Sequence, residues 1–295
     1  MTSSIRRNVL MILLALTTAI GAGCGGSEQR AETPSPTDTD RSADDMGLAA
    51  EGSGGEGATA EQAPPSPPPV MIVAGEHTPI EGAAPTLRIT APRADQLIRT
   101  GAVTIRMNLG NWPLEAPQGP HVHLIVDDEP YIAIRDARAP IDLDAVMQQN
   151  LGHGLSEGTH VVRMFPSRGH HESVKEPGAF AMVVFHYRSR TDGFSFDPTA
   201  PLLTYSRPKG CNPAGERVLL DFYVSNAELA EGGTRVRWTL DGQSGEIASW
   251  TPHFIEHLQE GEHSLQLTLI GADGSPIPGM FNDTTRTFTV ASSCP

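Results

Sequence analysis

Histidines are the residues of this sequence that could do chemistry. The chain has eleven of them, and seven lie between residues 121 and 186. His121 and His123 stand two residues apart in an alternating run, which predicts a β-strand with both imidazoles on one side. His170 and His171 follow in a polar loop that could bring further ligands to the pair. Because neutral imidazole binds copper and zinc, these four histidines are a candidate copper or zinc site.

Two segments of the chain repeat one pattern, so the folded part is expected to contain two copies of one design. Residues 121–128 match residues 235–242, and residues 155–162 match residues 258–265, in the same order. Each copy would have roughly 100 residues, which is the size of an immunoglobulin-like β-sandwich.

The second copy acts as a control on the histidine pair of the first. Arg235 and Arg237 stand where the first copy has His121 and His123, and the residues between them in both copies are apolar. We therefore expect the two histidines on the outer face of their sheet, open to solvent. Two alternatives remain, an ordinary polar exterior and a surface site for a metal or another ligand.

Short alternating runs bounded by Gly, Pro, Asn or Asp predict β-strands over most of residues 86–295. One helix is expected from Leu143 to Asn150, with Asp142 as its N-cap. Each copy also has a leucine, two polar residues, a glycine, a polar residue and a histidine before an alternating strand. This phrase resembles the turn into a late strand of bacterial immunoglobulin-like domains, which implies a structural role for His160. The expected fold class is all-β, with two tandem Ig-like β-sandwiches.

The domain boundaries follow from shifts in composition. Before the first copy, the chain is rich in Gly, Ser and Pro and strongly acidic, which is typical of a disordered tether. Between the copies, a Pro-rich segment contains Leu202, Leu203 and Tyr205, so it either packs against one sandwich or is a solvated linker. The expected parts are a signal peptide over 1–24, a tether over 25–85, a first sandwich over 86–192, an interdomain segment over 193–210 and a second sandwich over 211–295.

Two of the three cysteines frame the second copy. Cys211 comes just before its first strand and Cys294 just after its last, and the ends of first and last strands can meet in a sandwich. A disulfide between them is expected in an exported protein, because export leads to an oxidising compartment. The alternative is two free thiols.

The amino terminus has the layout of a cleaved export signal. Arg6 and Arg7 precede an apolar run that is too short to span a bilayer, and small residues then lead to Cys24. The segment resembles a bacterial lipoprotein signal, although Gly21 stands where that family prefers Leu. The resemblance implies lipidation of Cys24 and a membrane anchor. Gly25, in place of the Asp that retains lipoproteins at the inner membrane, favours the outer membrane; the alternative is an ordinary secretory signal.

Charge and missing motifs narrow the function. The chain has 35 acidic and 21 basic residues and a formal charge of −14, which argues against nucleic acid as a partner. Lipase-type, zinc-protease and phosphate-loop motifs are absent. The expected function is a lipid-anchored envelope protein that presents its domains to a protein or glycan partner. The alternatives are a copper- or zinc-binding envelope protein and a hydrolase. A hydrolase would need a histidine, an acid and a nucleophile in one cleft; Ser167, His170 and Glu172 offer these groups, but neighbours in sequence rarely form a triad.

Overall fold

The computed structural model describes residues 68–294 and confirms the all-β, immunoglobulin-type fold. Within this part of the chain, no helix is both long and apolar enough to cross a membrane. The one α-helix confirms the expected position and cap, because the Asp142 carboxylate accepts a hydrogen bond from the Ala145 N–H at 3.1 Å. The predicted signal, Cys24 and most of the predicted tether lie outside the described residues.

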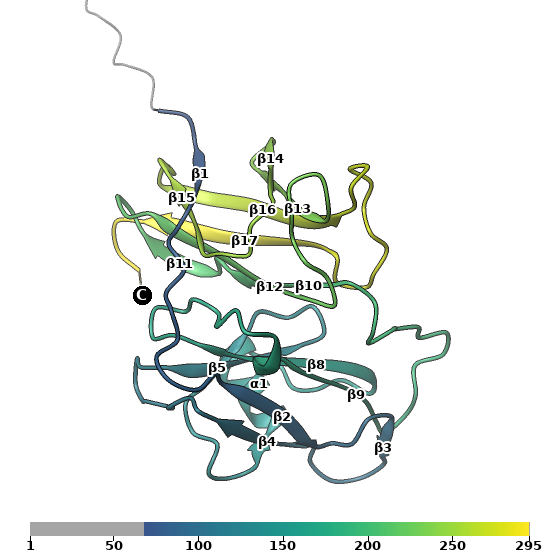
Figure 1. Cartoon of the computed structure of the whole chain (residues 1–295). Coiled ribbons are helices and arrows are strands. Elements are labelled where there is room, and N and C mark those ends of the chain that lie inside the picture. Colours follow the sequence, from purple (N-terminus) through teal and green to yellow (C-terminus); the bar gives the residue numbers. More distant parts are fainter. Residues whose placement is uncertain (1–67, 295) are drawn as a thin grey trace, which may run out of the picture. The chain divides into compact units, whose positions relative to one another are not determined.

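The first sandwich contains two sheets and both helical segments (Figure 1). Its elements are β2 (Thr86–Ala91), β3 (Gln96–Ile98), β4 (Thr104–Gly110), β5 (His121–Val126), β6 (Ile132–Ile134), β7 (Ile141–Asp142), α1 (Leu143–Leu151), β8 (Gly158–Ser167), the 3₁₀ turn η1 (Pro177–Ala179) and β9 (Ala181–Tyr187).

The second sandwich repeats this plan with strands of the second copy. Its elements are β10 (Leu202–Arg207), β11 (Gly210–Pro213), β12 (Val218–Ser225), β13 (Arg235–Leu240), β14 (Gln243–Ile247), β15 (His253–Glu256), β16 (Gly261–Ile270) and β17 (Asp283–Ala291). A further strand, β1 (Met71–Ala74), pairs with β15 at the edge of one sheet.

Sheet order confirms that the two halves are copies. The order β3-β9-β8-β5-β6 in the first half corresponds to β11-β17-β16-β13-β14 in the second, and β2-β4-β7 corresponds to β10-β12-β15. In both large sheets the edge strand is parallel to its neighbour, as β3 is to β9 and β11 is to β17. The predicted repeat is therefore a repeat of topology as well as of pattern.

The same hydrogen bonds at a turn explain why the sequence motif around His160 recurs around His263. His160 Nδ1 lies 2.7 Å from an Asp127 carboxylate oxygen, and His263 Nδ1 lies 2.6 Å from the matching oxygen of Asp241. Both aspartates have a φ of 48°, and each also accepts the backbone N–H of the residue directly after the histidine. Each histidine, which lies in β8 or β16, is thus bound to the left-handed residue that follows the paired strand, β5 or β13, and this is a structural role.

The two halves pack against each other through the outer faces of two sheets. Alternate residues of β8 point into the first core, while Val161, Arg163 and Phe165 point toward β10 and β12 of the second half. As a result β5 and β8 are buried along their whole length. The expectation of an exposed histidine pair was therefore wrong: His121 and His123 are on the outer face, but the second sandwich covers that face.

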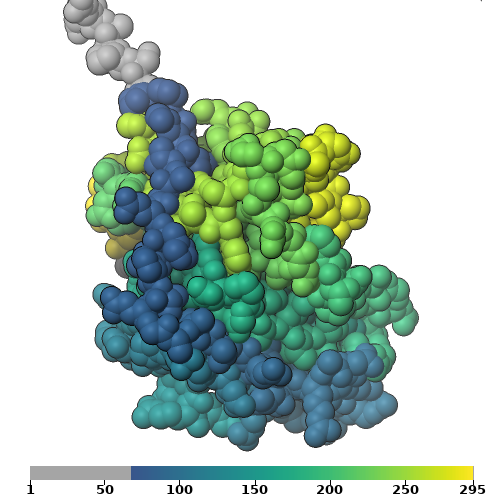
Figure 2. Space-filling view, viewed as in Figure 1, coloured from purple at the N-terminus to yellow at the C-terminus, as the bar shows by residue number. Residues whose placement is uncertain are grey.

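Two segments expected to lie outside the sandwiches are strands. Residues Leu202–Arg207 of the interdomain segment form β10, so this segment is part of the second sandwich and not a solvated linker. Met71–Ala74, expected within the tether, forms β1 at the edge of the same sheet. Figure 2 shows the chain after β1 running over the surface of both halves. In this segment, the Thr78 carbonyl accepts a hydrogen bond from the Arg168 guanidinium at 2.6 Å.

The Cys211–Cys294 disulfide is confirmed. Cys211 lies in β11, which pairs in parallel with β17, and Cys294 lies three residues after the end of β17. The parallel pair brings the two Cα atoms within 5.5 Å of each other. The bond closes a loop with a sequence separation of 83, for which the chain-entropy model gives ~4 kcal/mol of stabilisation.

One buried ion pair joins the halves. Lys175 Nζ lies 2.8 Å from a carboxylate oxygen of Asp221, and the two side chains are only 2% and 0% exposed. The Lys175 ammonium also donates to the Ser173 hydroxyl and the Phe222 carbonyl, and Ser173 donates to Asp221. Burying two charges is tolerated here because nearly every donor and acceptor has a partner.

We predict that Asp221→Leu lowers the free energy of unfolding by about 3–5 kcal/mol, because it leaves the Lys175 ammonium buried without a counter-ion. The double variant Lys175→Met/Asp221→Leu should be clearly more stable than Asp221→Leu alone. Urea unfolding of the wild type, Lys175→Met, Asp221→Leu and the double variant measures both effects. Glu157→Gln, at the exposed Arg188–Glu157 pair, is the control and should cost about 1 kcal/mol or less. A double variant no more stable than the single one would contradict the account.

Candidate metal centre

Three histidines converge where the two sandwiches meet. β5 turns His121 and His123 to the covered face, and β8 ends at Ser167, directly opposite His121. The chain then forms a tight loop that is closed by the β-bridge between Ser167 and Ser173, and His171 in this loop has a left-handed conformation with a φ of 72°. The loop places His171 next to the histidines of β5. One nitrogen from each of the three imidazoles lies within 4.8 Å of the other two.

The tautomer of His121 follows from its neighbours. Its Nδ1 lies 2.9 Å from the Gly119 carbonyl oxygen, which can only accept, so this nitrogen holds the proton. Its Nε2 therefore has a free lone pair. That lone pair lies 3.0 Å from His123 Nε2 and 3.0 Å from His171 Nδ1. Three nitrogens thus face one small volume, which is the arrangement of ligands around a metal ion.

The second sandwich supplies the outer support of the cluster. The hydroxyl of Ser206, on β10, lies 3.1 Å from His123 Nδ1. Tyr131, just before β6, stacks on the His123 ring with centroids 3.6 Å apart. Lys209 in turn donates to the Tyr131 carbonyl oxygen at 2.6 Å. Metal-binding histidines commonly have such a partner on the second ring nitrogen, which fixes the ring and its tautomer.

Burial keeps the three imidazoles neutral. It lowers the pKa of His121 to about 4 and that of His171 to about 3, and it holds the pKa of His123 well below the ordinary value. The positive charges of Arg207 and Lys209 lower all three pKa values further. Neutral imidazole is the form that binds metal, so the cluster needs no deprotonation at pH 7.

The fourth predicted ligand, His170, does not join the cluster. Its side chain is 62% exposed, and its Nε2 lies 2.9 Å from a Glu172 carboxylate oxygen. Sequence reasoning missed Tyr131 and Ser206. The alternation of β6 contains a signal for Tyr131, because Ile132 and Ile134 face the core and so place Tyr131 on the histidine side. Ser206 had no such signal, since it comes from the other half of the chain.

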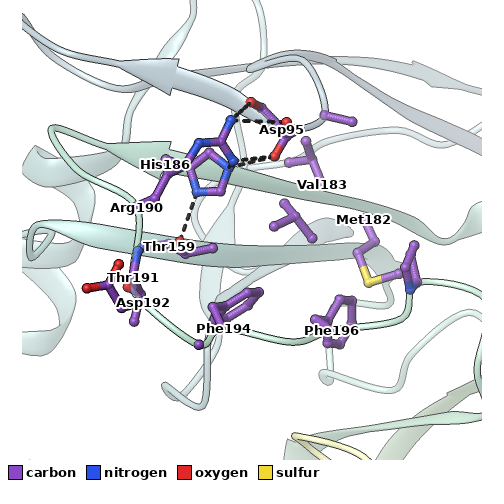
Figure 3. A pocket seen from close by; sticks show the side chains of 14 residues that line it. Asp95, Thr159, Met182, Val183, His186, Arg190, Thr191, Asp192, Phe194 and Phe196 are labelled. Atoms are coloured by element: carbon purple, nitrogen blue, oxygen red, sulfur yellow. Dashed lines mark hydrogen bonds and ion pairs between the residues drawn. The ribbon is translucent and has the colours of Figure 1, made fainter. Parts of the chain in front are cut away.

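A second constellation lines a pocket of about 610 Å³ beside β9 (Figure 3). The Thr159 hydroxyl lies 2.8 Å from His186 Nδ1, and His186 Nε2 lies 2.8 Å from an Asp95 carboxylate oxygen. This is the order of a hydrolase triad. However, the Thr159 hydroxyl accepts the Thr191 N–H, and the Thr159 N–H donates to the Thr191 hydroxyl. This pair of bonds holds the loop after β9 against β8.

Ser167, His170 and Glu172, which are close in sequence, do not form a triad. The Ser167 hydroxyl donates to the Glu172 carbonyl oxygen at 3.2 Å, and it is His170 that meets the Glu172 carboxylate. A serine whose hydroxyl is bound to backbone has no base to activate it. The polar loop therefore has a structural role, which is to position His171.

Comparisons with known proteins give no family for this chain. No family model matches it, and no curated protein matches. Among solved structures, the fibronectin(III)-like modules of Clostridium thermocellum CbhA match at 14% identity and a TM-score of 0.25, over 70% of this chain and 94% of theirs. Three N-terminal domains of the bacteriophage RB49 outer capsid protein Hoc match at 10% identity and 0.20, over 70% and 69%.

A Corynebacterium diphtheriae protein, whose name proposes that it is membrane anchored, matches at 10% identity and a TM-score of 0.22, over 71% of this chain and 59% of that one. These similarities concern the fold alone, and the β-sandwich assignment stands on the strand pairing described above. We conclude that the described part of the chain is a pair of immunoglobulin-type β-sandwiches, with a cluster of three histidines, two of them fully buried, where the sandwiches meet.

The repeated turn gives a pH-dependent prediction. Burial lowers the pKa of His160, but the hydrogen bond and charge of Asp127 outweigh it, so the pKa is raised. A raised pKa in the folded state stabilises the fold at low pH, and this stabilisation is lost as pH rises through the folded pKa. His160→Gln should therefore cost more stability at pH 5.5 than at pH 8.5 in urea unfolding with a chelator present. His153→Gln, at an exposed histidine, is the control; an equal cost of His160→Gln at both pH values would contradict the assignment.

Proposed function

We propose that this is an exported cell-envelope protein that binds a copper or zinc ion through His121, His123 and His171. The observation that supports the proposal is the convergence of three imidazole nitrogens. His121 Nε2 lies 3.0 Å from His123 Nε2 and 3.0 Å from His171 Nδ1. Ligand atoms of one tetrahedral zinc ion are ~3.3 Å apart, given Zn–N bonds of ~2.0–2.1 Å. Two of the three nitrogen separations are thus close to this value, and the third is within 4.8 Å.

The surroundings support a metal site over an ordinary buried polar cluster. Two of the imidazoles have no solvent exposure, yet their outer ring nitrogens already have partners in Gly119 and Ser206. Their inner nitrogens face one another, and a single lone pair of His121 meets two other nitrogens. Neutral rings can satisfy such a centre only partly with hydrogen bonds, whereas a metal ion satisfies all three lone pairs.

The metal proposal is tested by calorimetric titration of the full chain with Cu²⁺ and Zn²⁺. We expect one ion per chain, and we expect His121→Ala and His171→Ala to weaken binding by more than about 100-fold. His170→Ala is the matched control, because it removes a neighbouring exposed imidazole that lies outside the cluster. Two outcomes would overturn the proposal. One is that His170→Ala weakens binding as much as His121→Ala and His171→Ala do, and the other is that the wild-type chain binds neither ion tightly.

Lipidation of Cys24 belongs to the same proposal, since the lipobox-like signal and the acidic segment that follows support a tethered envelope protein. In a bacterium with two membranes, the wild-type chain should take up labelled palmitate and sediment with outer membranes. Cys24→Ser should lose the label, whereas Cys211→Ser should keep it. A wild-type chain released without lipid would show that the signal is an ordinary secretory one.

A second candidate is a binding or structural module for a protein or glycan partner in the envelope. It is favoured by the seam between the sandwiches, where a buried ion pair and an aromatic cluster around Tyr223 hold the halves in one compact unit. Such a unit would present its loops at a fixed spacing. The titration separates the two candidates, because a module without a metal would bind neither ion tightly.

A further inference from the structure

Tyr131 is a residue that the metal proposal leaves unused. We infer that its phenol oxygen is the fourth ligand, which makes the centre a three-histidine, one-tyrosine site suited to copper(II). This inference rests on the proposed function, because it names the metal and the last ligand of the same site. It adds to the histidine cluster a donor of a different chemical kind.

The position of the phenol supports the inference. The Tyr131 hydroxyl oxygen lies 3.0 Å from His171 Nδ1, which is the nitrogen that also faces His121. Four donor atoms thus form a continuous chain in the order His123, His121, His171, Tyr131, with each neighbour 3.0 Å from the next. The ring cannot easily turn away, because it is 2% exposed and stacks on His123 at an interplanar angle of 11°.

Burial raises the pKa of the Tyr131 phenol to about 12, and the positive charges beside it act in the opposite direction, toward a phenolate. Lys209 Nζ lies 3.8 Å from the centre of the Tyr131 ring, and the Arg207 guanidinium carbon lies 5.6 Å from it. Among residues 68–294, the carboxylates within 4.0 Å of a basic side chain pair with other partners and not with Lys209, Arg207 or Arg135. A divalent ion held by neutral imidazoles alone would add positive charge to this cationic surrounding. A phenolate ligand offsets that charge.

The chemistry of the donor set favours copper(II). Structural and catalytic zinc sites are built from Cys, His, Asp and Glu, whereas mixed nitrogen and oxygen donors in tetragonal geometry suit copper(II). On binding, the O–H bond of Tyr131 breaks, its proton leaves to solvent and a copper–oxygen bond forms. No electron is transferred, so the ion stays copper(II).

The test is the visible spectrum of the full chain with one equivalent of Cu²⁺. We expect a phenolate-to-copper charge-transfer band that is lost in Tyr131→Phe, together with copper binding weakened by about 10–100-fold. Tyr187→Phe, at a half-buried tyrosine outside the cluster, is the control and should keep the band. Resonance Raman scattering of the wild-type chain gives a reading that needs no variant, because a bound phenolate enhances tyrosine ring vibrations.

The outcomes separate this inference from the metal proposal. Copper binding that depends on His121 but shows no phenolate band and no effect of Tyr131→Phe would overturn the inference and leave the metal site standing. An absence of histidine-dependent copper binding would overturn both. Zinc bound as tightly as copper by the wild type would also contradict the inference, because the phenolate would then confer no preference.

Discussion

The packing of one sandwich onto the outer face of another is the constraint on which the rest of this structure depends. It buries β5 and β8 on both faces, so residues that would be solvated in a single sandwich lie in a dry interior. Each polar group there needs a partner. Lys175 finds Asp221, Arg163 donates to Thr204, and the histidines find one another.

The two copies show how much that cover matters. Arg235 and Arg237 occupy the register positions of the histidine pair, but no sandwich among residues 68–294 covers their face, and both pair with Glu246 in partial contact with solvent. The same backbone geometry therefore gives a hydrated ion pair in one half and a neutral imidazole cluster in the other. The chemistry of the site comes from the packing of the halves and not from the sandwich fold itself.

Much of the architecture could be predicted from local patterns. Alternation gave the strands and the core face of β5, the repeated His160 phrase gave the turn, and cysteine positions gave the disulfide. The prediction that His121 and His123 are exposed was wrong, because alternation tells which side of a strand a residue occupies and not what covers that side. The members of the histidine cluster were only partly predicted, because His170 and His171 are adjacent in sequence and only the loop conformation decides which one turns inward.

The central claim is that three imidazoles, two of them fully buried, hold one metal ion where the two sandwiches meet. X-ray absorption at the metal edge, measured on the full chain loaded with one equivalent of copper, tests it most directly. The account predicts a first shell that contains three imidazole nitrogens at about 2.0 Å, with the multiple-scattering pattern of histidine rings. A shell of oxygen atoms alone, or a spectrum unchanged by His121→Ala, would contradict it.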